Sequence, residues 1–156
     1  MGRILVAVDL SESSALVTSR AVELARSMQF ELIALHVYDP DVLMQTLADS
    51  GMALDQYIDV LQSDLLRLTA SAGAVGLRIR AEVTEGHAVG ATILKTADRI
   101  GADLIVMGTH GRTGVWRTIL GSVAEDVLRH AVRPVLIVPL RSATVPAPAV
   151  SRASAS

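Results

Sequence analysis

The sequence predicts a doubly wound α/β fold, in which helices cover both faces of a single five-stranded parallel sheet. Five short apolar runs of strand length alternate along the chain with four segments whose apolar residues recur every three or four positions. Most of these runs are almost continuously apolar, which is typical of parallel strands buried on both faces. Such alternation predicts right-handed crossovers and one sandwich-like domain.

The five expected strands are short. Residues 77–83 (LRIRAEV) alternate apolar and polar side chains, as a strand with one exposed face does. The expected strands are Ile4–Val8, Leu32–Val37, Leu77–Val83, Leu104–Met107 and Val135–Val138.

The first two expected helices follow the first two strands. Ser11 or Ser13 is the expected cap of the first helix. Residues 39–51 fit neither a strand nor the second helix, and we expect a loop or a short helical excursion over the sheet's edge there. The expected apolar face of the first helix comprises Val17, Ala21, Leu24, Ala25 and Met28. That of the second comprises Leu54, Ile58, Leu61, Leu65 and Leu68.

The third and fourth expected helices have clear end signals. The third should stop at Gly101, a residue suited to a left-handed cap. The fourth should begin at Ser122, with Glu125 at the capping-box spacing, and end before Pro134. Its expected apolar face comprises Val123, Val127, Leu128 and Ala131.

Length and composition predict one domain over residues 1–141, followed by a disordered tail rich in Ala, Ser and Pro over residues 142–156. Aromatic residues make up only 3% of the chain, so its core must be aliphatic. The net charge of −2 provides no basic field for nucleic acid. The chain has no cysteine for a thiolate site.

No apolar run approaches the length of a membrane span, and the apolar run near the N-terminus is too short for a signal peptide. We therefore expect no membrane association and a cytoplasmic location. The spacing of the four histidines leads us to assign them neither metal-ligand partners nor a metal site.

A glycine-rich segment, GTHGRTGVWRTILGS (residues 108–122), follows the fourth strand. Its spacing is G-x2-G-x9-G-S, without the lysine of a P-loop. Ligands of doubly wound sheets bind beyond the carboxyl ends of the strands, and glycine amides together with a helix N-terminus favour phosphate. The backbone N–H groups of Ser122 and Val123 could hold such an anion, supplemented by Thr109, Thr113 and Arg112 or Arg117.

Simpler interpretations stand beside this one. Gly108 and Gly111 could serve only as turn residues. Ser122 with Glu125 could form an ordinary capping box. Asp9, at the end of the first strand, could cap the first helix through an Asx turn. All three features fall at carboxyl ends of strands in one expected sheet, and this coincidence favours a ligand site.

The segment GTHGRTGVWRTILGSVAEDVLRHAVRPVLIVP resembles the signature of the universal stress protein family, in particular its ATP-binding branch. The family pattern G-x2-G-x9-G-[ST] is matched without a gap. ILVAVDLSESS, LHVYD and GADLIVMGTHG resemble further family segments, so the resemblance covers about residues 3–140. It implies a Rossmann-like fold of the adenine-nucleotide alpha-hydrolase type.

The resemblance also implies a set of ligand contacts. Val8 and Asp9 would lie near adenine and ribose, with Asp9 also near a Mg²⁺ ion that accompanies ATP. Val37 or His36 would meet the adenine edge through the main chain, and Met107 and Gly108 would border the ribose. The phosphates would be held by Gly111, Gly121, Ser122 and Val123. Trp116, the only tryptophan, would cover the ligand or pack at a subunit surface.

Three functions follow from these features. The first is an ATP-binding stress protein that acts as a nucleotide-dependent regulatory or protective module. The second is a slow ATPase or autophosphorylating protein that uses Asp9 and a loop hydroxyl. The third is a nucleotide-free structural dimer. The resemblance further implies a homodimer through the edge strand Val135–Val138.

Overall fold

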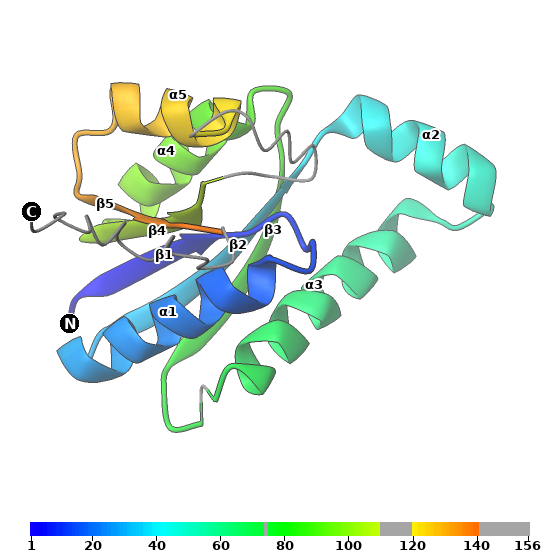
Figure 1. The fold of residues 1–156 in the computed structure, drawn as a ribbon. Helices are drawn as coiled ribbons and strands as arrows, with labels where there is room; N and C mark the ends of the chain where they lie inside the picture. The colour runs from blue at the N-terminus through cyan, green and yellow to red at the C-terminus, as the bar shows by residue number, and fades with distance from the viewer. Residues whose placement is uncertain (74, 110–119, 141–156) are drawn as a thin grey trace, which may run out of the picture.

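The computed structural model describes residues 1–73, 75–109 and 120–140 of the 156-residue chain. Its five strands are all parallel and form one sheet in the order β3-β2-β1-β4-β5 (Figure 1). The expected α/β fold with a five-stranded parallel sheet is therefore confirmed. The strands are β1 (Arg3–Ala7), β2 (Glu31–Tyr38), β3 (Ile79–Glu85), β4 (Leu104–Gly108) and β5 (Val135–Val138).

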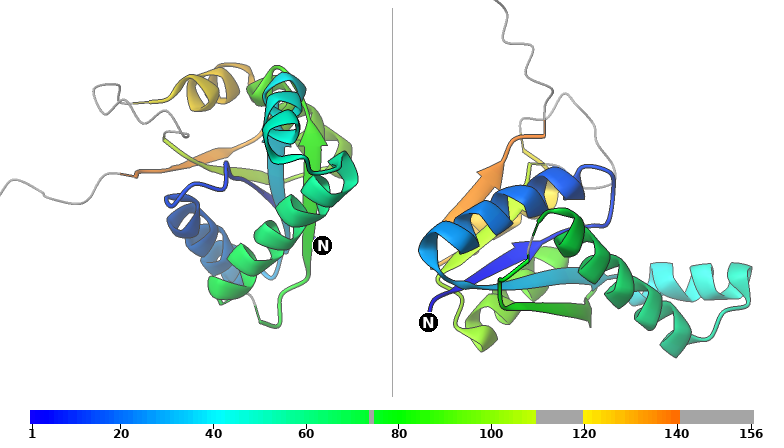
Figure 2. Two further views of the ribbon diagram at one scale, coloured as in Figure 1. Left: turned by 90° about the vertical axis from the view of Figure 1, so that its right-hand side faces the viewer. Right: turned by 90° about the horizontal axis from the view of Figure 1, so that it is seen from below.

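The helices cover both faces of this sheet, as a doubly wound fold requires. Figure 2 shows α1 and α3 on one side of the strands and α4 and α5 on the other. α4 ends at Gly101 in the left-handed region (φ 63°), as the sequence predicts. The helices are α1 (Ser14–Met28), α2 (Pro40–Ser50), α3 (Leu54–Ser71), α4 (Val89–Ile100) and α5 (Ser122–His130).

The central strand β1 contributes to two hydrophobic cores. Ile4 and Val6 pack with residues of α1 and α3, whereas Leu5 packs on the opposite face with residues of α4 and α5. All three side chains are fully buried. This double burial explains why the strand reads as an unbroken apolar run rather than an alternating one.

α2 is the short helical excursion expected over residues 39–51. Asp39 caps it, because its carboxylate accepts a hydrogen bond from the backbone N–H of Asp41 (2.9 Å), and Pro40 occupies the first helical position. The helix projects away from the sheet (Figure 1), and Leu43 is its only buried residue. α2 is thus attached to the domain mainly through its first turn.

Some expected helix faces are wrong at particular residues. Met28, Leu54 and Leu128 are 44%, 46% and 42% exposed. Met28 is the last residue of α1 and Leu54 is the first of α3. Each therefore lies at a helix end, where only one adjacent helical turn can cover its side chain. Ser13 occupies the N-cap position of α1 but makes no side-chain capping hydrogen bond.

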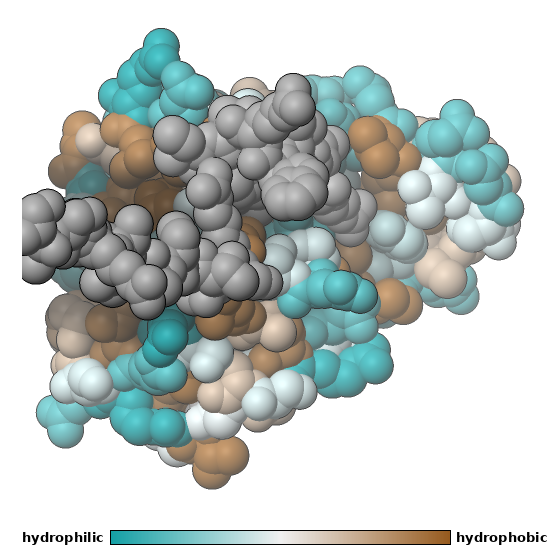
Figure 3. All heavy atoms as spheres, in the orientation of Figure 1, coloured by the Kyte–Doolittle hydropathy of each residue, from teal (hydrophilic) through white to brown (hydrophobic). Residues whose placement is uncertain are grey.

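The surface drawn in Figure 3 shows hydrophobic residues scattered among hydrophilic ones over the part that carries α1 and α3. Among the described helices, none is both long enough and apolar enough to cross a membrane.

Two adjacent leucines of α3 test how this fold is held together. Leu65 is fully buried and Leu66 is 50% exposed. We expect Leu65→Ala to lower the free energy of unfolding by about 2–5 kcal/mol, because it leaves a cavity under the sheet. Leu66→Ala should change it by less than about 1 kcal/mol. Urea denaturation followed by circular dichroism measures both, and equal losses would contradict the assigned core.

Candidate functional site

A cavity of about 620 Å³ opens at the carboxyl ends of β1, β2 and β4. The sheet order places β2 and β3 on one side of β1, and β4 and β5 on the other. The chain therefore reverses its direction of sheet growth between β1 and β4, beside this cavity. Doubly wound proteins bind their ligands at this position.

Most of the residues that the sequence analysis assigned to a site line the cavity together. The remaining two, Gly111 and Arg112, lie outside the described residues, as do His110, Thr113, Trp116 and Arg117. The assigned residues found in the cavity wall are Val8, Asp9, His36, Val37, Met107, Gly108, Gly121, Ser122 and Val123.

Asp9 organises the turn between β1 and α1. Its Oδ1 accepts hydrogen bonds from the backbone N–H of Ser11 (3.0 Å) and from the hydroxyls of Ser11 (2.6 Å) and Ser14 (3.0 Å). The bond to the N–H two residues on is an Asx turn. Asp9 therefore has the structural role considered in the sequence analysis, and it is also one of the residues that line the cavity.

His36 is almost fully buried (6% exposed) at the end of β2. Its Nδ1 lies 3.0 Å from the carbonyl oxygen of Val8. Because a carbonyl oxygen only accepts hydrogen bonds, Nδ1 carries the hydrogen in this contact. The contact joins the ends of β1 and β2 and fixes the orientation of the imidazole in the cavity wall.

Gly108 is closely packed against other side chains of the chain. A Cβ atom there would lie 2.8 Å from Cδ1 of Leu140 and 3.2 Å from Cγ2 of Val17. These side chains fill the space that the missing Cβ leaves. The sequence analysis interpreted this glycine as one that lets an anion approach the backbone, and the described contacts give a different reason for it.

The start of α5 differs from the expected capping box. The N-cap position falls on Gly121 (φ −75°, ψ 160°), which has no side chain to cap the helix, and Ser122 is the first helical residue. Glu125 forms an ion pair with Arg129 instead (2.7 Å). The capping box of Ser122 with Glu125 is therefore wrong, and among the described residues no side chain caps the N-terminus of α5.

This helix N-terminus can receive an anion. The first N–H groups of a helix have no partner within it, and the helix dipole makes this end positive. Gly121, Ser122 and Val123 all line the cavity. Among the described lining residues there is no lysine or arginine. An anion in the described part of the cavity would therefore be held mainly by main-chain groups.

The opposite wall of the cavity was missed in the sequence analysis. It comes from α2 and α3 and includes Val42, Leu43, Thr46, Tyr57 and Leu61. Residues 39–51 were expected to cross the sheet's edge, but α2 was not assigned an apolar face, so its part in a cavity wall was not predicted. This wall is largely apolar and suits a flat, weakly polar group such as a base.

Tyr38, the last residue of β2, also lines the cavity. Burial, and secondarily the negative charge of Glu85, raises the pKa of its phenol above the ordinary value of about 10. The phenol is therefore neutral at physiological pH and can donate a hydrogen bond.

Two histidines have carboxylate partners that the sequence analysis did not assign. His130 Nδ1 lies 3.1 Å from Oδ1 of Asp126, four residues earlier on α5. His87 Nδ1 lies 3.4 Å from Oδ1 of Asp39, which is remote in sequence. The first pair is visible as an i,i+4 spacing, whereas the second forms only when β2 and β3 are paired.

Comparisons with known proteins agree with this architecture. A profile of the universal stress protein family matches residues 1–139. The universal stress protein MJ0531 of Methanocaldococcus jannaschii is 33% identical over 138 residues, which cover 87% of this chain and 81% of that protein.

Two solved structures are similar over most of their length. The structure of MJ0577, from the same organism, superposes with a TM-score of 0.75 at 25% identity, covering 90% of this chain and 97% of that one. A universal stress protein solved in complex with cAMP has a TM-score of 0.66 at 27% identity, covering 90% and 98%.

Titration of Tyr38 tests the described cavity wall. The ultraviolet absorbance of tyrosinate, taken as wild type minus Tyr38→Phe, should show a midpoint above about 10. Glu85→Gln should lower that midpoint only in part, because burial is the larger cause. The folded state holds this proton more tightly, so its contribution to stability is present below pH about 10 and is lost as pH rises through the raised pKa. An unshifted midpoint would contradict the burial of the phenol.

Proposed function

The chain belongs to the universal stress protein family, and on this premise we propose that it binds an adenine nucleotide, specifically ATP with Mg²⁺, in the cavity at the end of β1 and β4. The observation that carries the proposal is the uncapped N-terminus of α5, which lines a cavity with a largely apolar opposite wall. The cAMP complex of a related protein supports the adenine nucleotide class.

The residues divide between the parts of such a ligand. The apolar wall from α2 and α3 would pack against the base, with the main chain near Val37 at its edge. The backbone N–H groups of Ser122 and Val123 would donate hydrogen bonds to phosphate oxygens. Asp9 would supply a carboxylate oxygen, the ligand type that Mg²⁺ prefers. Gly111 and Arg112 retain the phosphate contacts proposed for them from the sequence.

We propose that the protein acts as a nucleotide-dependent regulatory module rather than as an enzyme. Oδ1 of Asp9 supports the turn before α1, and Nδ1 of His36 contacts the Val8 carbonyl. Both side chains that could act on a bound phosphate thus have contacts that maintain the fold, and we assign Asp9 the role of a magnesium ligand rather than of a catalytic base. Bound ATP would then serve to stabilise one state of the protein.

ATP binding is tested by thermal unfolding. At 100 times its dissociation constant, ATP with Mg²⁺ should add about 2.7 kcal/mol to the free energy of unfolding. For a domain of this size the Tm should rise by roughly 5–10 °C. GTP should give a much smaller rise. If cAMP or AMP raises the Tm and ATP does not, the adenine nucleotide class stands and ATP is wrong.

A substitution at the N-cap of α5 locates the phosphates. Gly121→Asp places a carboxylate where it caps the helix, and the φ of −75° accepts any residue. The unliganded protein should keep its Tm or gain slightly, while the ATP-induced rise is lost, because the carboxylate repels phosphate and occupies its N–H donors. A retained rise would show that the phosphates bind elsewhere.

We also propose a homodimer through the edge of β5. Ile105 N–H donates to the Pro134 carbonyl (3.0 Å) and Thr109 N–H to the Val138 carbonyl (3.1 Å). Hydrogen bonds to one neighbour alternate along a parallel strand. The main-chain groups of Leu136 therefore point to β4. Those of Val135 and Ile137 point to the open edge, where no described strand pairs with them.

The proposed dimer interface can be tested by removing a single backbone hydrogen-bond donor from the open edge of β5. Light scattering at micromolar concentration should give the mass of a dimer. Ile137→Pro removes an outward N–H and should shift the protein toward monomer with little change in circular dichroism, since proline is tolerated on edge strands. Ile137→Val, which keeps the donor, should remain dimeric. A monomeric wild type would refute the interface.

A further inference from the structure

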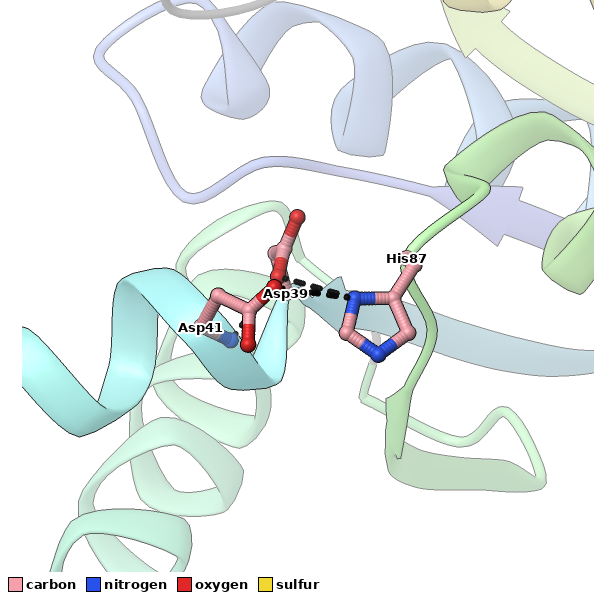
Figure 4. Close-up of side chains that lie close together, drawn as sticks. All are labelled: Asp39, Asp41 and His87. Atoms are coloured by element: carbon pink, nitrogen blue, oxygen red, sulfur yellow. Dashed lines mark hydrogen bonds and ion pairs between the residues drawn. The ribbon is translucent and has the colours of Figure 1, made fainter.

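We propose that the Asp39, Asp41 and His87 side chains form a binding site for a first-row divalent transition-metal ion, of which Zn²⁺ is the reference case. The three side chains come from two separate segments. Asp39 and Asp41 lie at the start of α2, and His87 lies in the turn between β3 and α4. Figure 4 shows the imidazole directed at the two carboxylates.

The interatomic distances suit metal coordination. His87 Nδ1 lies 3.4 Å from Oδ1 of Asp39 and 3.5 Å from Oδ2 of Asp41. One ligand atom from each of the three residues lies within 4.8 Å of the others. Tetrahedral zinc with bonds of about 2.0–2.2 Å separates its ligand atoms by about 3.4 Å. The two nitrogen–oxygen distances therefore match a tetrahedral edge.

The backbone holds the two segments together independently of these side chains. Tyr38 pairs with Glu85 in the β2–β3 ladder, and the N–H of Gly86 donates to the Tyr38 carbonyl (2.9 Å). Asp39 and His87 are the residues that follow Tyr38 and Gly86. Asp39 and His87 therefore lie close together because of the register of β2 and β3, and not because of an attraction between their charges.

One ligand is also oriented by a second contact. The backbone N–H of Asp41 donates to Oδ1 of Asp39 (2.9 Å), which fixes the rotation of that carboxylate. Hydrogen bonds of this kind orient metal ligands in known sites. The N-cap that starts α2 therefore also positions a ligand of the proposed ion.

The electrostatic balance at the site favours a cation. The N-terminus of α2 contributes about half a positive charge, whereas the two carboxylates contribute two negative ones. Among the described ion pairs, no arginine or lysine contacts Asp39 or Asp41. By contrast, Glu31 is paired with Arg3 and Arg80.

The ligand types select the class of ion. Mg²⁺ and Ca²⁺ prefer sites made of oxygen ligands. An imidazole nitrogen with two carboxylates suits Zn²⁺, Co²⁺ and Ni²⁺. Three protein ligands leave a coordination position for water. The side chains of Asp41 and His87 are 86% and 68% exposed, so an ion can enter from solvent.

Such an ion would attach α2 to the body of the domain. This helix has one buried residue, and its Val42 and Thr46 line the cavity. A bond from its first turn to the β3–α4 turn would hold those residues at the cavity wall. The expected consequence of metal binding is slower hydrogen exchange in α2, with little change in the sheet.

The test is calorimetric titration of Zn²⁺ into the full chain, freed of metal and without nucleotide, so that it does not depend on the proposed function. The wild type should bind one ion per chain at this site, more tightly as pH rises because the proton competes for imidazole. His87→Arg removes the imidazole ligand and should weaken binding at least about tenfold. Asp41→Asn should do likewise.

The matched control is His130→Ala. His130 has one carboxylate partner, Asp126, at 3.1 Å, and therefore lacks the third ligand. This variant should bind Zn²⁺ at the Asp39 site as the wild type does. Wild-type affinity in His87→Arg, or an equal loss in His130→Ala, would overturn the proposal. Hydrogen exchange of α2 that Zn²⁺ leaves unchanged would overturn the attachment of the helix.

Discussion

The parallel pairing of β1 with β2 on one side and with β4 on the other is the constraint on which the site depends. Leu5 is opposite Ile33 in one ladder and Ile105 in the other. Because the strands run in the same direction, their carboxyl ends and the helix N-termini that follow meet at one edge of the sheet. The Asp9 turn, His36 and the start of α5 are adjacent for this reason, although they are far apart in the sequence.

At that edge of the sheet, side-chain hydrogen bonds close the β1–α1 turn, whereas the N-terminus of α5 has no side-chain cap among the described residues. The β1–α1 turn is closed by Asp9 and His36 contacts the Val8 carbonyl, whereas the N-cap of α5 is a glycine. A serine or aspartate at position 121 would satisfy the helix from within. The glycine adds no side-chain cap to these N–H groups, so in the proposed complex they would hold the phosphate in place of a lysine or arginine, which the described cavity wall lacks.

Most features set by local chemistry could be predicted from the sequence, and features set by tertiary contacts could not. The double burial of β1 and the left-handed cap at Gly101 follow from residue type and periodicity. The absent capping box at Ser122 was missed for a local reason, because the N-cap falls one residue earlier, on Gly121, and Glu125 pairs with Arg129 four residues further on. The role of Gly108 was also hidden, since its space is filled by Leu140, which is distant in the sequence.

α2 links the two proposed sites. Asp39 caps it and faces His87, while Val42 and Thr46, within its first two turns, line the cavity. A metal ion and a nucleotide would thus both act on one weakly packed helix. If the ion stabilises α2 at the cavity wall, it must raise nucleotide affinity, and the nucleotide must raise metal affinity by the same factor. The projecting helix, which buries little of its own surface, is then the element through which the two sites are coupled.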